Sequence, residues 1–283
     1  MLKIAVQKSG RLSEGSIQLL KDTGLQFNNG RKQLLATASN FPVEILYLRD
    51  DDIPQYVQDG VADLGIVGEN TLMETGKSVK VIRQLGFSKC RLSLAIPKAD
   101  HYTGPEYFAG KRIATSYVKI LQDFLTSNDL TAEIHPISGS VEIAPGIGLA
   151  DAVMDIVSTG STLISNGLKE VEVVTRSEAV LIAHKAISDE KQKILDKLAF
   201  RINAVLTARG YKYILLNAPN DKIDEIIAVL PGMKSPTVLP LADKGWSSVH
   251  SVVEEKQLWE VIDKLKMKGA QGLLIIPIEK MVV

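Results

Sequence analysis

Short apolar runs of strand length alternate with helical patterns through the first two-thirds of this 283-residue chain. That rhythm is typical of α/β folds whose largely parallel strands are joined by helices. The expected strands are Leu2–Val6, Val43–Leu48, Leu64–Val67, Leu92–Ile96, Arg112–Thr115, Ala152–Val157 and Val171–Thr175. The expected helices are Ser13–Thr23, Ile53–Asp59 and Val118–Thr126, the second with Asp51 or Asp52 as N-cap and Pro54 in its first turn.

Two strand patterns in a row, Val171–Thr175 and Val180–His184, interrupt this alternation before a long helix at Asp189–Arg209. We interpret the interruption as a return crossing. The chain would build one lobe, cross to a second near Gly86–Cys90 and recross near Ala179–Lys185. Two lobes joined in this way form a cleft, and ligands favour clefts.

After Gly210 the order of elements changes to β-α-β-β-α-β, which is the ferredoxin-like order. The expected strands are Tyr211–Leu216, Thr237–Leu241, Ser248–Glu254 and Gly272–Pro277, and the expected helices are Lys222–Leu230 and Gln257–Met267. The second helix carries apolar residues at helical spacing, so one of its faces should cover a sheet. The tail is therefore expected to be a separate module.

Composition excludes several classes of protein. Lys and Arg together number 33, as do Asp and Glu, so the net charge provides no field for a nucleic acid or an anionic membrane. Cys90 is the only cysteine, which excludes an internal disulfide and CxxC motifs, and we expect it to be a small core residue. The sequence shows neither a secretory signal pattern nor an apolar run approaching the ~20 residues of a membrane span. A cytoplasmic enzyme or binding protein is expected.

The strongest chemical pattern is the run Ser158-Thr159-Gly160-Ser161-Thr162 directly after the expected strand Ala152–Val157. A helix that begins there presents unpaired N–H groups, and Gly160 lets the backbone approach an anion closely. The run therefore predicts a phosphate site. Asp155, just before it, suits the two hydroxyls of a ribose, and Asp151 is expected on the same face of the strand.

The alternative is that Ser158, Thr159 and Ser161 are only helix caps and that Asp155 is a solvated strand end. Capping uses one hydroxyl well, whereas five small residues follow the acidic strand here. We therefore favour the phosphate site.

Three further polar groups follow expected strands. Lys8, Gly10 and Arg11 follow the first, Arg49 begins an Arg-Asp-Asp-Asp run after the second, and Glu69 and Asn70 form a polar turn after the third. In parallel sheets such positions meet at the carboxyl edge, where ligands bind. Taken singly, each is also compatible with solvated or capping side chains. The four histidines show no metal-ligand spacing, and no GxSxG nucleophile motif is present, which disfavours zinc-dependent and covalent mechanisms.

In combination these segments resemble a known family over the whole length of the chain. The segments are Gln7–Leu12, Arg49–Pro54, Asp63–Asn70, Gly110–Tyr117 and Asp155–Leu163, with Ser235-Pro236-Thr237 and Ile276–Met281 in the tail. They closely resemble the ATP phosphoribosyltransferases, in the long form that carries a regulatory domain. The resemblance implies the first step of histidine biosynthesis, in which N1 of ATP displaces pyrophosphate from 5-phosphoribosyl 1-pyrophosphate, with Mg²⁺ required.

The resemblance also implies a two-lobed catalytic part similar to periplasmic binding proteins and a C-terminal ferredoxin-like (ACT-like) regulatory domain. The implied limits are 1–88 with 180–209 for the first lobe, 89–179 for the second, and 210–283 for the regulatory domain. The resemblance further implies an assembly of dimers that associate into hexamers. Histidine is the implied feedback inhibitor, bound at Asn217, Met233, Thr237 and Gly272.

Roles for individual residues follow from the same resemblance. Asp151 and Asp155 would hold the ribose diol and Ser158–Thr162 the 5-phosphate. The catalytic group would be Arg49, Lys8, Arg31 and Glu142, with Arg49 and Mg²⁺ on the departing pyrophosphate; the metal would be held through substrate phosphates. Lys8, Gly10, Arg11, Glu69 and Asn70 would face ATP. Unlike the more widespread phosphoribosyltransferase signature, which has two adjacent acidic residues, this chain has a single aspartate before its loop.

Two other classes are compatible with parts of the pattern. A solute-binding protein shares the two-lobed architecture, because fold alone does not fix function. A small-molecule-sensing regulator would also bind a ligand, but the sequence shows no helix-turn-helix and no basic DNA-binding face.

Overall fold

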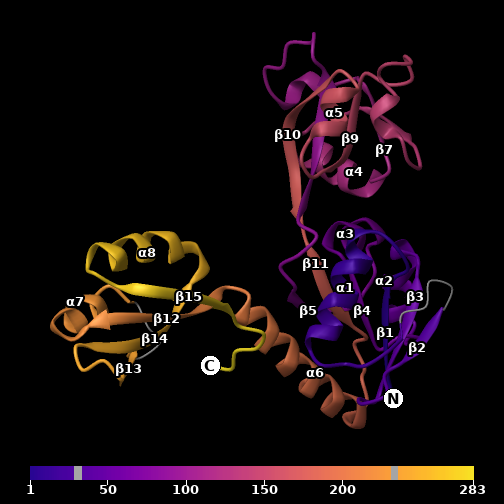
Figure 1. Cartoon of the computed structure of the whole chain (residues 1–283). Helices are drawn as coiled ribbons and strands as arrows, with labels where there is room; N and C mark the ends of the chain where they lie inside the picture. Colours follow the sequence, from indigo (N-terminus) through magenta and orange to yellow (C-terminus); the bar gives the residue numbers. More distant parts are fainter. Residues whose placement is uncertain (29–33, 231–234) are drawn as a thin grey trace. The chain divides into compact units, whose positions relative to one another are not determined.

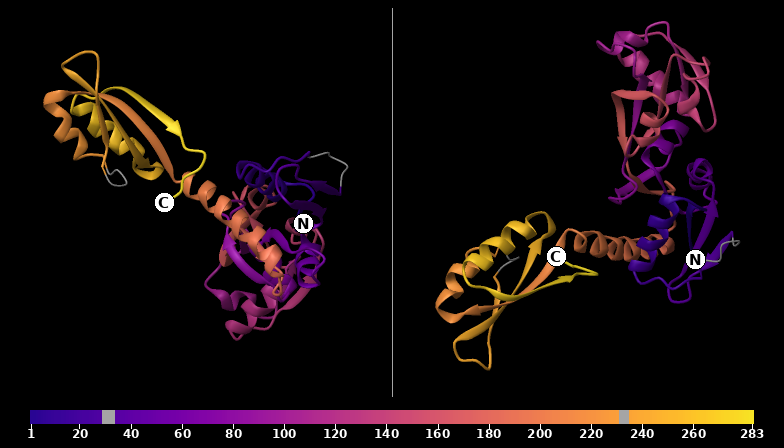
Figure 2. Two further views of the ribbon diagram at one scale, coloured as in Figure 1. Left: turned by 90° about the horizontal axis from the view of Figure 1, so that it is seen from below. Right: turned by 45° about the horizontal axis from the view of Figure 1, so that its top comes forward.

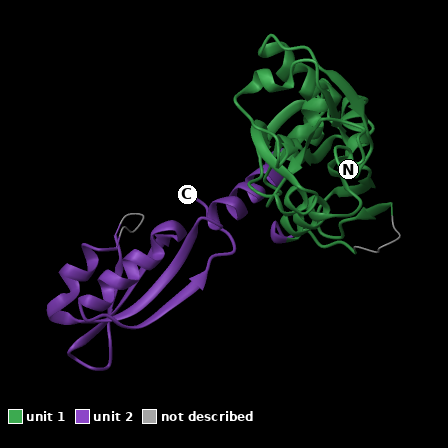
Figure 3. Ribbon diagram, turned by 90° about the horizontal axis from the view of Figure 1, so that it is seen from above, with its two compact units in different colours: residues 1–21, 25–195 green, residues 22–24, 196–283 purple. Residues whose placement is uncertain are grey.

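The computed structural model describes residues 1–28, 34–230 and 235–283. The chain divides into two compact units, residues 1–21 with 25–195 and residues 22–24 with 196–283 (Figure 3). The boundary falls inside the long helix α6 (Asp189–Ala208).

The first unit contains two sheets, and we call each sheet with its helices a lobe. The sheet of the first lobe has the strand order β2-β3-β1-β4-β11-β5 (Figure 1). Its strands are β1 (Leu2–Gln7), β2 (Leu35–Thr37), β3 (Val43–Leu48), β4 (Leu64–Gly68), β5 (Lys80–Gln84) and β11 (Ala179–Ala183). β1 lies parallel to β3 and β4, so the carboxyl ends of these three strands meet at one edge.

Helices α1 (Arg11–Asp22), α2 (Ile53–Gln58) and α3 (Glu69–Thr75) belong to this lobe. α2 packs on one face of the sheet, where Ile53 and Val57 join Ala5, Val67 and Ile182 in a buried cluster. Asp52 occupies the N-cap position of α2, but its side chain makes no capping hydrogen bond. Asp50–Asp52 form a short 3₁₀ turn, so Asp52 takes the expected N-cap position without the side-chain bond that capping would use.

The sheet of the second lobe has the order β10-β6-β9-β7-β8. Its strands are β6 (Cys90–Pro97), β7 (Arg112–Thr115), β8 (Glu133–Pro136), β9 (Ala152–Val157) and β10 (Leu168–Ser177). β9, β7 and β8 run parallel, and β6 is antiparallel to both of its neighbours. Helix α4 (Val118–Ser127) packs on one face, and α5 (Ser161–Ser165) covers the other through Leu163.

The chain crosses between lobes twice. The first crossing lies between the end of β5 at Gln84 and the start of β6 at Cys90, and the return lies at Glu178, between β10 and β11. The first crossing overlaps the expected Gly86–Cys90, and the return lies one residue before the expected Ala179–Lys185.

The second unit contains most of α6 and a four-stranded sheet of order β13-β14-β12-β15. Its elements are β12 (Tyr211–Pro219), α7 (Ile223–Ile227), β13 (Thr237–Pro240), β14 (Trp246–Glu254), α8 (Leu258–Met267) and β15 (Gln271–Pro277). All neighbouring strands are antiparallel, and α7 and α8 cover one face (Figure 2). We call this sheet with its helices the tail.

The expected fold class, a two-lobed α/β part similar to periplasmic binding proteins followed by a ferredoxin-like domain, is confirmed. Four elements were not expected from the sequence: β2, β5, β8 and α3. The compact-unit boundary at 195/196 differs from the expected limit at 209/210 because α6 spans it, and the three domain limits stay a prediction. Among the described residues, no helix combines the length and apolar character that crossing a membrane requires.

Candidate active site

The loop Ser158-Thr159-Gly160 connects β9 to α5 at the carboxyl end of the parallel strands β7, β8 and β9. Gly160 is the N-cap of α5 and has φ +81°, a left-handed conformation that disfavours any residue with a Cβ. Ser158, Thr159, Ser161 and Thr162 are exposed. The first N–H groups of a helix lack intrahelical partners, so the turn offers both backbone and hydroxyl donors.

The hydroxyl groups are only partly used within the protein. Thr159 Oγ1 lies 3.0 Å from Ser161 Oγ and accepts the Ser161 N–H at 3.4 Å, a long bond. Gly160, rather than a hydroxyl residue, occupies the N-cap position. Capping therefore accounts for little of the hydroxyl content of this loop.

Asp155 lies in β9, three residues before the loop, and is half-buried rather than solvated. Burial raises the pKa of its carboxyl group, and the nearby carboxylate of Glu142 raises it further. The N–H of Ile156 donates to Asp155 Oδ1 at 2.7 Å and acts in the opposite direction. Glu142 comes from the 3₁₀ turn Val141–Ile143. Two carboxylates in a half-buried setting favour a ligand that donates hydrogen bonds or carries positive charge.

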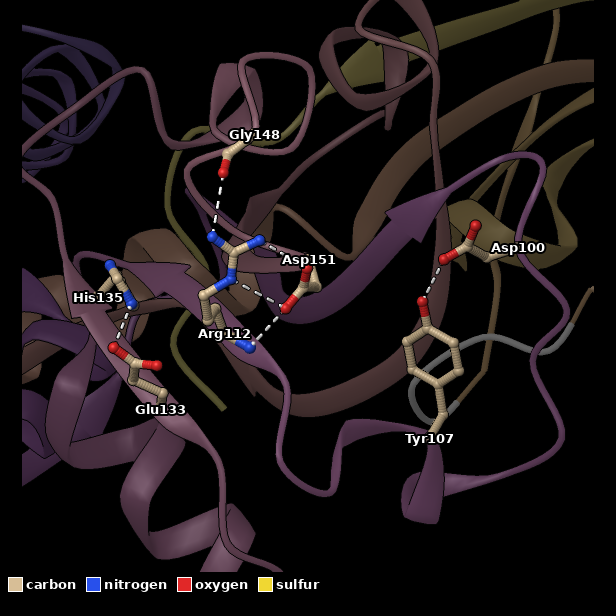
Figure 4. A network of polar contacts seen from close by, with 7 residues as sticks. All are labelled: Asp100, Tyr107, Arg112, Glu133, His135, Gly148 and Asp151. Atoms are coloured by element: carbon tan, nitrogen blue, oxygen red, sulfur yellow. Dashed lines mark hydrogen bonds and ion pairs between the residues drawn. The ribbon is translucent and has the colours of Figure 1, made fainter.

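Asp151 lies at the other end of β9 and does not share this environment. Four residues of strand separate it from Asp155, which is about 13 Å. Its carboxylate is held by Arg112, with Nη2 at 2.9 Å, Nε at 3.2 Å and the backbone N–H at 2.9 Å (Figure 4). These bonds lower the pKa of Asp151 to about 2. The expectation that Asp151 joins Asp155 at the ribose is not supported: alternation predicts the face of a strand, not the end at which a side chain lies.

A cavity of about 370 Å³ brings the second-lobe residues together with Arg11 of the first lobe. Arg11 is the first residue of α1, and Gly10 before it has φ +92°. The cavity is lined by Arg11, Glu142, Asp155, Ile156, Val157, Ser158, Thr159, Gly160, Ser161, Thr162 and Leu163. We call it the loop cavity. It places one cation opposite a hydroxyl-rich turn and two carboxylates.

A second cavity, of about 460 Å³, shares Arg11, Ile156 and Ser158 with the loop cavity. It also contacts Asn70 and Cys90, so Cys90 is half-buried at a cavity wall and not the core residue expected from its apolar context. A third cavity, of about 680 Å³, shares Asp50, Thr71 and Tyr117 with the second. The three cavities therefore adjoin one another along the two lobes.

The remaining predicted residues of the first lobe stand beside cavity-lining residues at the carboxyl edge of the sheet. Lys8 follows β1, and its N–H bonds to Leu48 at the end of β3, next to Arg49. Both side chains are exposed, and neither lines the three cavities. Glu69 and Asn70 open helix α3, so the polar turn expected there is wrong.

The side chain of Asn70 bonds two residues of the second lobe, Tyr117 and Ser177 at the end of β10. Its amide Nδ2 donates to Tyr117 Oη at 3.2 Å, and its Oδ1 accepts from Ser177 Oγ at 2.8 Å. Tyr117 lines both larger cavities, and burial raises its pKa.

Glu74 of α3 caps helix α4 of the other lobe. Its carboxylate accepts the N–H groups of Lys119 and Ile120 at the start of α4, at 2.9 and 3.0 Å. Sequence analysis assigned no role to Tyr117 or Glu74. Tyr117 had a usable pattern, since Ser116-Tyr117 follows a strand parallel to β9, whereas Glu74 becomes informative only when the lobes are brought together.

The predicted inhibitor residues divide into two places in the tail. A Cβ on Gly272 would lie 3.3 Å from Asn217 Nδ2, so these two residues are adjacent. Thr237 lies in β13, and β14 and β12 separate it from β15, a distance of about 14 Å. Arg31 and Met233 lie outside the described residues.

The sequence predicts that Mg²⁺ is held through substrate phosphates, and it identifies no protein ligands for the metal. The described part of the chain holds no group of three or more His, Cys, Asp or Glu side chains arranged for a metal ion.

Comparison with known proteins identifies the family. The family described as ATP phosphoribosyltransferase (HisG) matches residues 49–204, and the HisG C-terminal domain matches residues 208–280. An ATP phosphoribosyltransferase of Cytophaga hutchinsonii is 62% identical over 100% of this chain and 99% of its own length, and one of Bacteroides thetaiotaomicron is 61% identical over the whole of both chains. A solved structure described as an ATP phosphoribosyl transferase (HisG:HisZ) complex from Thermotoga maritima superposes with a TM-score of 0.61 at 30% identity, over 72% of this chain and 99% of that one. The chain belongs to the ATP phosphoribosyltransferase family.

Proposed function

We propose that the loop cavity binds the phosphoribosyl group of 5-phosphoribosyl 1-pyrophosphate and that the chain transfers this group to N1 of ATP. As a member of its family the chain is an ATP phosphoribosyltransferase, the enzyme of the first step of histidine biosynthesis. One observation carries the assignment of the cavity. Asp155, whose pKa is raised by burial, opens with the hydroxyl-rich loop and Arg11 onto the same space.

The 5-phosphate would lie against Ser158–Thr162, where backbone N–H groups and hydroxyls donate to its oxygens and Arg11 balances its charge. The carboxylate of Asp155 would accept hydrogen bonds from the ribose hydroxyls. The N1 lone pair then forms the bond to C1′ while the bond from C1′ to the pyrophosphate oxygen breaks. Positive charge develops on the ribose ring, and Asp155 and Glu142 stabilise it because both carboxylates line the same cavity.

The departing pyrophosphate gains negative charge as the bond breaks. We assign Arg49 and Mg²⁺ to it, with the metal held by phosphate oxygens, which are ligands that Mg²⁺ prefers. Lys8, Gly10, Glu69 and Asn70 are assigned to ATP, together with Arg11 on the wall shared with the second cavity. Arg31 stays a prediction from the resemblance. Asp151 is left out of the binding site because Arg112 holds it at the far end of β9.

The central test measures pyrophosphate release with both substrates and with each one omitted. We expect release only when ATP, 5-phosphoribosyl 1-pyrophosphate and Mg²⁺ are all present. Arg49→Ala should lower kcat more than it raises the KM for ATP, because its cation acts where charge develops. Equal kcat in this variant and the parent, with chemistry limiting, would remove Arg49 from the pyrophosphate. Release without ATP would show hydrolysis in place of transfer, and no release with all three present would reopen the solute-binding alternative.

The tail is proposed to bind histidine as a feedback inhibitor of a cytoplasmic enzyme that assembles from dimers into hexamers. Asn217 and Gly272 would form one end of the inhibitor site. Thr237 is too distant to contact the same amino acid within one tail, so it would reach it from a second copy.

A histidine titration of turnover tests this part. Thr237→Val should weaken inhibition and leave the uninhibited kcat near that of the parent, whereas Thr131→Val, an exposed threonine of the second lobe, should change neither. Inhibition of the Thr237→Val enzyme at the parent's histidine concentration, with light scattering showing the same assembly, would remove Thr237 from the site.

A further inference from the structure

Arg91, the second residue of β6, contacts the backbone of the phosphate loop. Its Nη1 donates to the carbonyl oxygen of Ser158 at 3.1 Å. Its other two donor positions are occupied by Glu170 of β10, with Nε at 2.5 Å from Oε1 and Nη2 at 2.6 Å from Oε2. Ser93 Oγ donates to the same Oε1 at 2.7 Å, which fixes the carboxylate in turn. The guanidinium is therefore held at three points, only one of which is the loop.

The strand register places this group on the face of the sheet that carries Asp155. Arg91 pairs with Val157, and Ser93 pairs directly with Asp155 on β9. Residues opposite one another in a ladder share a face, so Arg91 and Ser93 lie on the same face as Asp155. The Arg91–Glu170 pair is only partly exposed, at 27% and 24% of the two side chains.

We propose that Arg91, oriented by Glu170, is a positioning residue that sets the phosphate loop in its binding conformation; the inference rests on the proposed function of that loop. The peptide unit between Ser158 and Thr159 is planar and trans, so its carbonyl and its N–H point in opposite directions. Holding the Ser158 carbonyl toward Arg91 turns the Thr159 N–H away from it and fixes the direction of one phosphate donor.

Glu170 has a second consequence in this arrangement. An arginine beside Asp155 would pair with that carboxylate and occupy the acceptor that the ribose needs. Bidentate bonding to Glu170 engages Nε and Nη2 of Arg91 and leaves Nη1 for the loop. Asp155 thus stays available to substrate although a cation lies on the same sheet face.

The test uses Arg91→Lys, which keeps the charge but loses the fork of donors. Ribose 5-phosphate, titrated by calorimetry, is the probe because it needs no turnover. We expect its affinity and the KM for 5-phosphoribosyl 1-pyrophosphate to weaken roughly tenfold, the size of one hydrogen bond in a charged network, with the KM for ATP within about twofold of the parent. Glu170→Ala should weaken the same two quantities. The double variant should be no worse than either single variant, since both changes act through one bond.

Arg112→Lys is the matched control. It breaks a bidentate arginine–carboxylate pair in the same sheet, at the end of β9 remote from the loop (Figure 4). It should lower the melting temperature about as much as Arg91→Lys and leave the affinity for ribose 5-phosphate unchanged. Equal losses of affinity in the two variants would reduce Arg91 to a structural residue and overturn the proposal.

Thr159→Val separates this proposal from the proposed function. If Thr159→Val weakens ribose 5-phosphate binding and Arg91→Lys does not, the loop is the phosphate site and the role of Arg91 is wrong. If Thr159→Val has no effect either, the phosphate site lies elsewhere, and the positioning role falls with it.

Discussion

Asp151 directly precedes β9 and Asp155 lies within it, and the two carboxylates have opposite surroundings. Asp151 receives three bonds from Arg112, and its pKa falls to about 2. Asp155 receives one backbone bond, lies half-buried near Glu142, and has a raised pKa. Arg91, which lies on the same face of the sheet as Asp155, is bound by Glu170 instead.

The difference separates a carboxylate that is bonded within the fold from one that is open to a cavity. A fully bonded carboxylate stabilises the fold but has no capacity left for a ligand. A half-buried carboxylate with few bonds costs stability in the empty protein, and that cost is recovered when a ligand supplies the missing donors. The comparison predicts that the two aspartates respond to the same substitution in opposite ways.

The largest expected effect is on turnover. Asp155→Asn should lower kcat/KM for 5-phosphoribosyl 1-pyrophosphate by roughly hundredfold, because hydrogen bonds from the ribose to a charged acceptor contribute up to about 3 kcal/mol. Asp151→Asn should change kcat/KM by less than about twofold. Initial rates at saturating ATP measure both. A large loss in Asp151→Asn at unchanged stability would return Asp151 to the site and cancel the distinction.

Sequence reasoning placed Asp155 beside the loop because the information for it is local. An apolar strand, an aspartate and five small residues stand next to one another, and Gly160 does adopt the left-handed conformation that its position requires. It did not reveal the partner of Asp151, because Arg112 is 39 residues away and begins a neighbouring strand. The spacing of four residues correctly gives a shared face but says nothing of which end of the strand meets the ligand.

The other omissions have the same origin. The strands β2, β5 and β8 are three to five residues long and carry exposed positions, so they lack a periodic apolar pattern. Arg91, Glu74 and Tyr117 gain their meaning from partners in distant segments, such as Glu170, Lys119 and Asn70. Side chains whose partners lie in distant segments leave little mark in their own neighbourhood of the sequence.

A smaller effect is expected on stability. The lowered pKa of Asp151, from 3.8 to about 2, means that its ion pair stabilises the fold above the ordinary pKa and that this contribution is lost as pH falls from about 4 toward 2. The shift alone corresponds to ~2.5 kcal/mol, but the side chain is 34% exposed, and solvent screening reduces the contribution to ~1 kcal/mol. Asp151→Asn should therefore lose ~1 kcal/mol at pH 7 and nothing near pH 2.

Asp155→Asn should show the opposite sign. Its pKa is raised, so ionisation costs stability as pH rises through that pKa, and the neutral amide removes the cost. Urea unfolding at several pH values measures both variants. A loss of stability at pH 7 in Asp155→Asn as large as in Asp151→Asn would show that Asp155 is also a structural carboxylate.

The smallest expected effect concerns Glu142, whose charge is one cause of the raised pKa of Asp155. Burial is the larger cause, so Glu142→Gln should lower the pKa of Asp155 only slightly. If Asp155 must be ionised to bind the ribose, the acid limb of the kcat/KM profile moves slightly to lower pH, whatever the variant does to the plateau rate. Glu133→Gln is the control, since that exposed carboxylate of β8 bonds His135 and should leave the limb in place (Figure 4). Ionisation of the substrate shifts the acid limb equally in the parent and the variants, so it does not affect their difference. An acid limb that stays unmoved in Glu142→Gln, or that moves equally in Glu133→Gln, would mean that another group sets it and that the raised pKa of Asp155 plays no part in substrate binding.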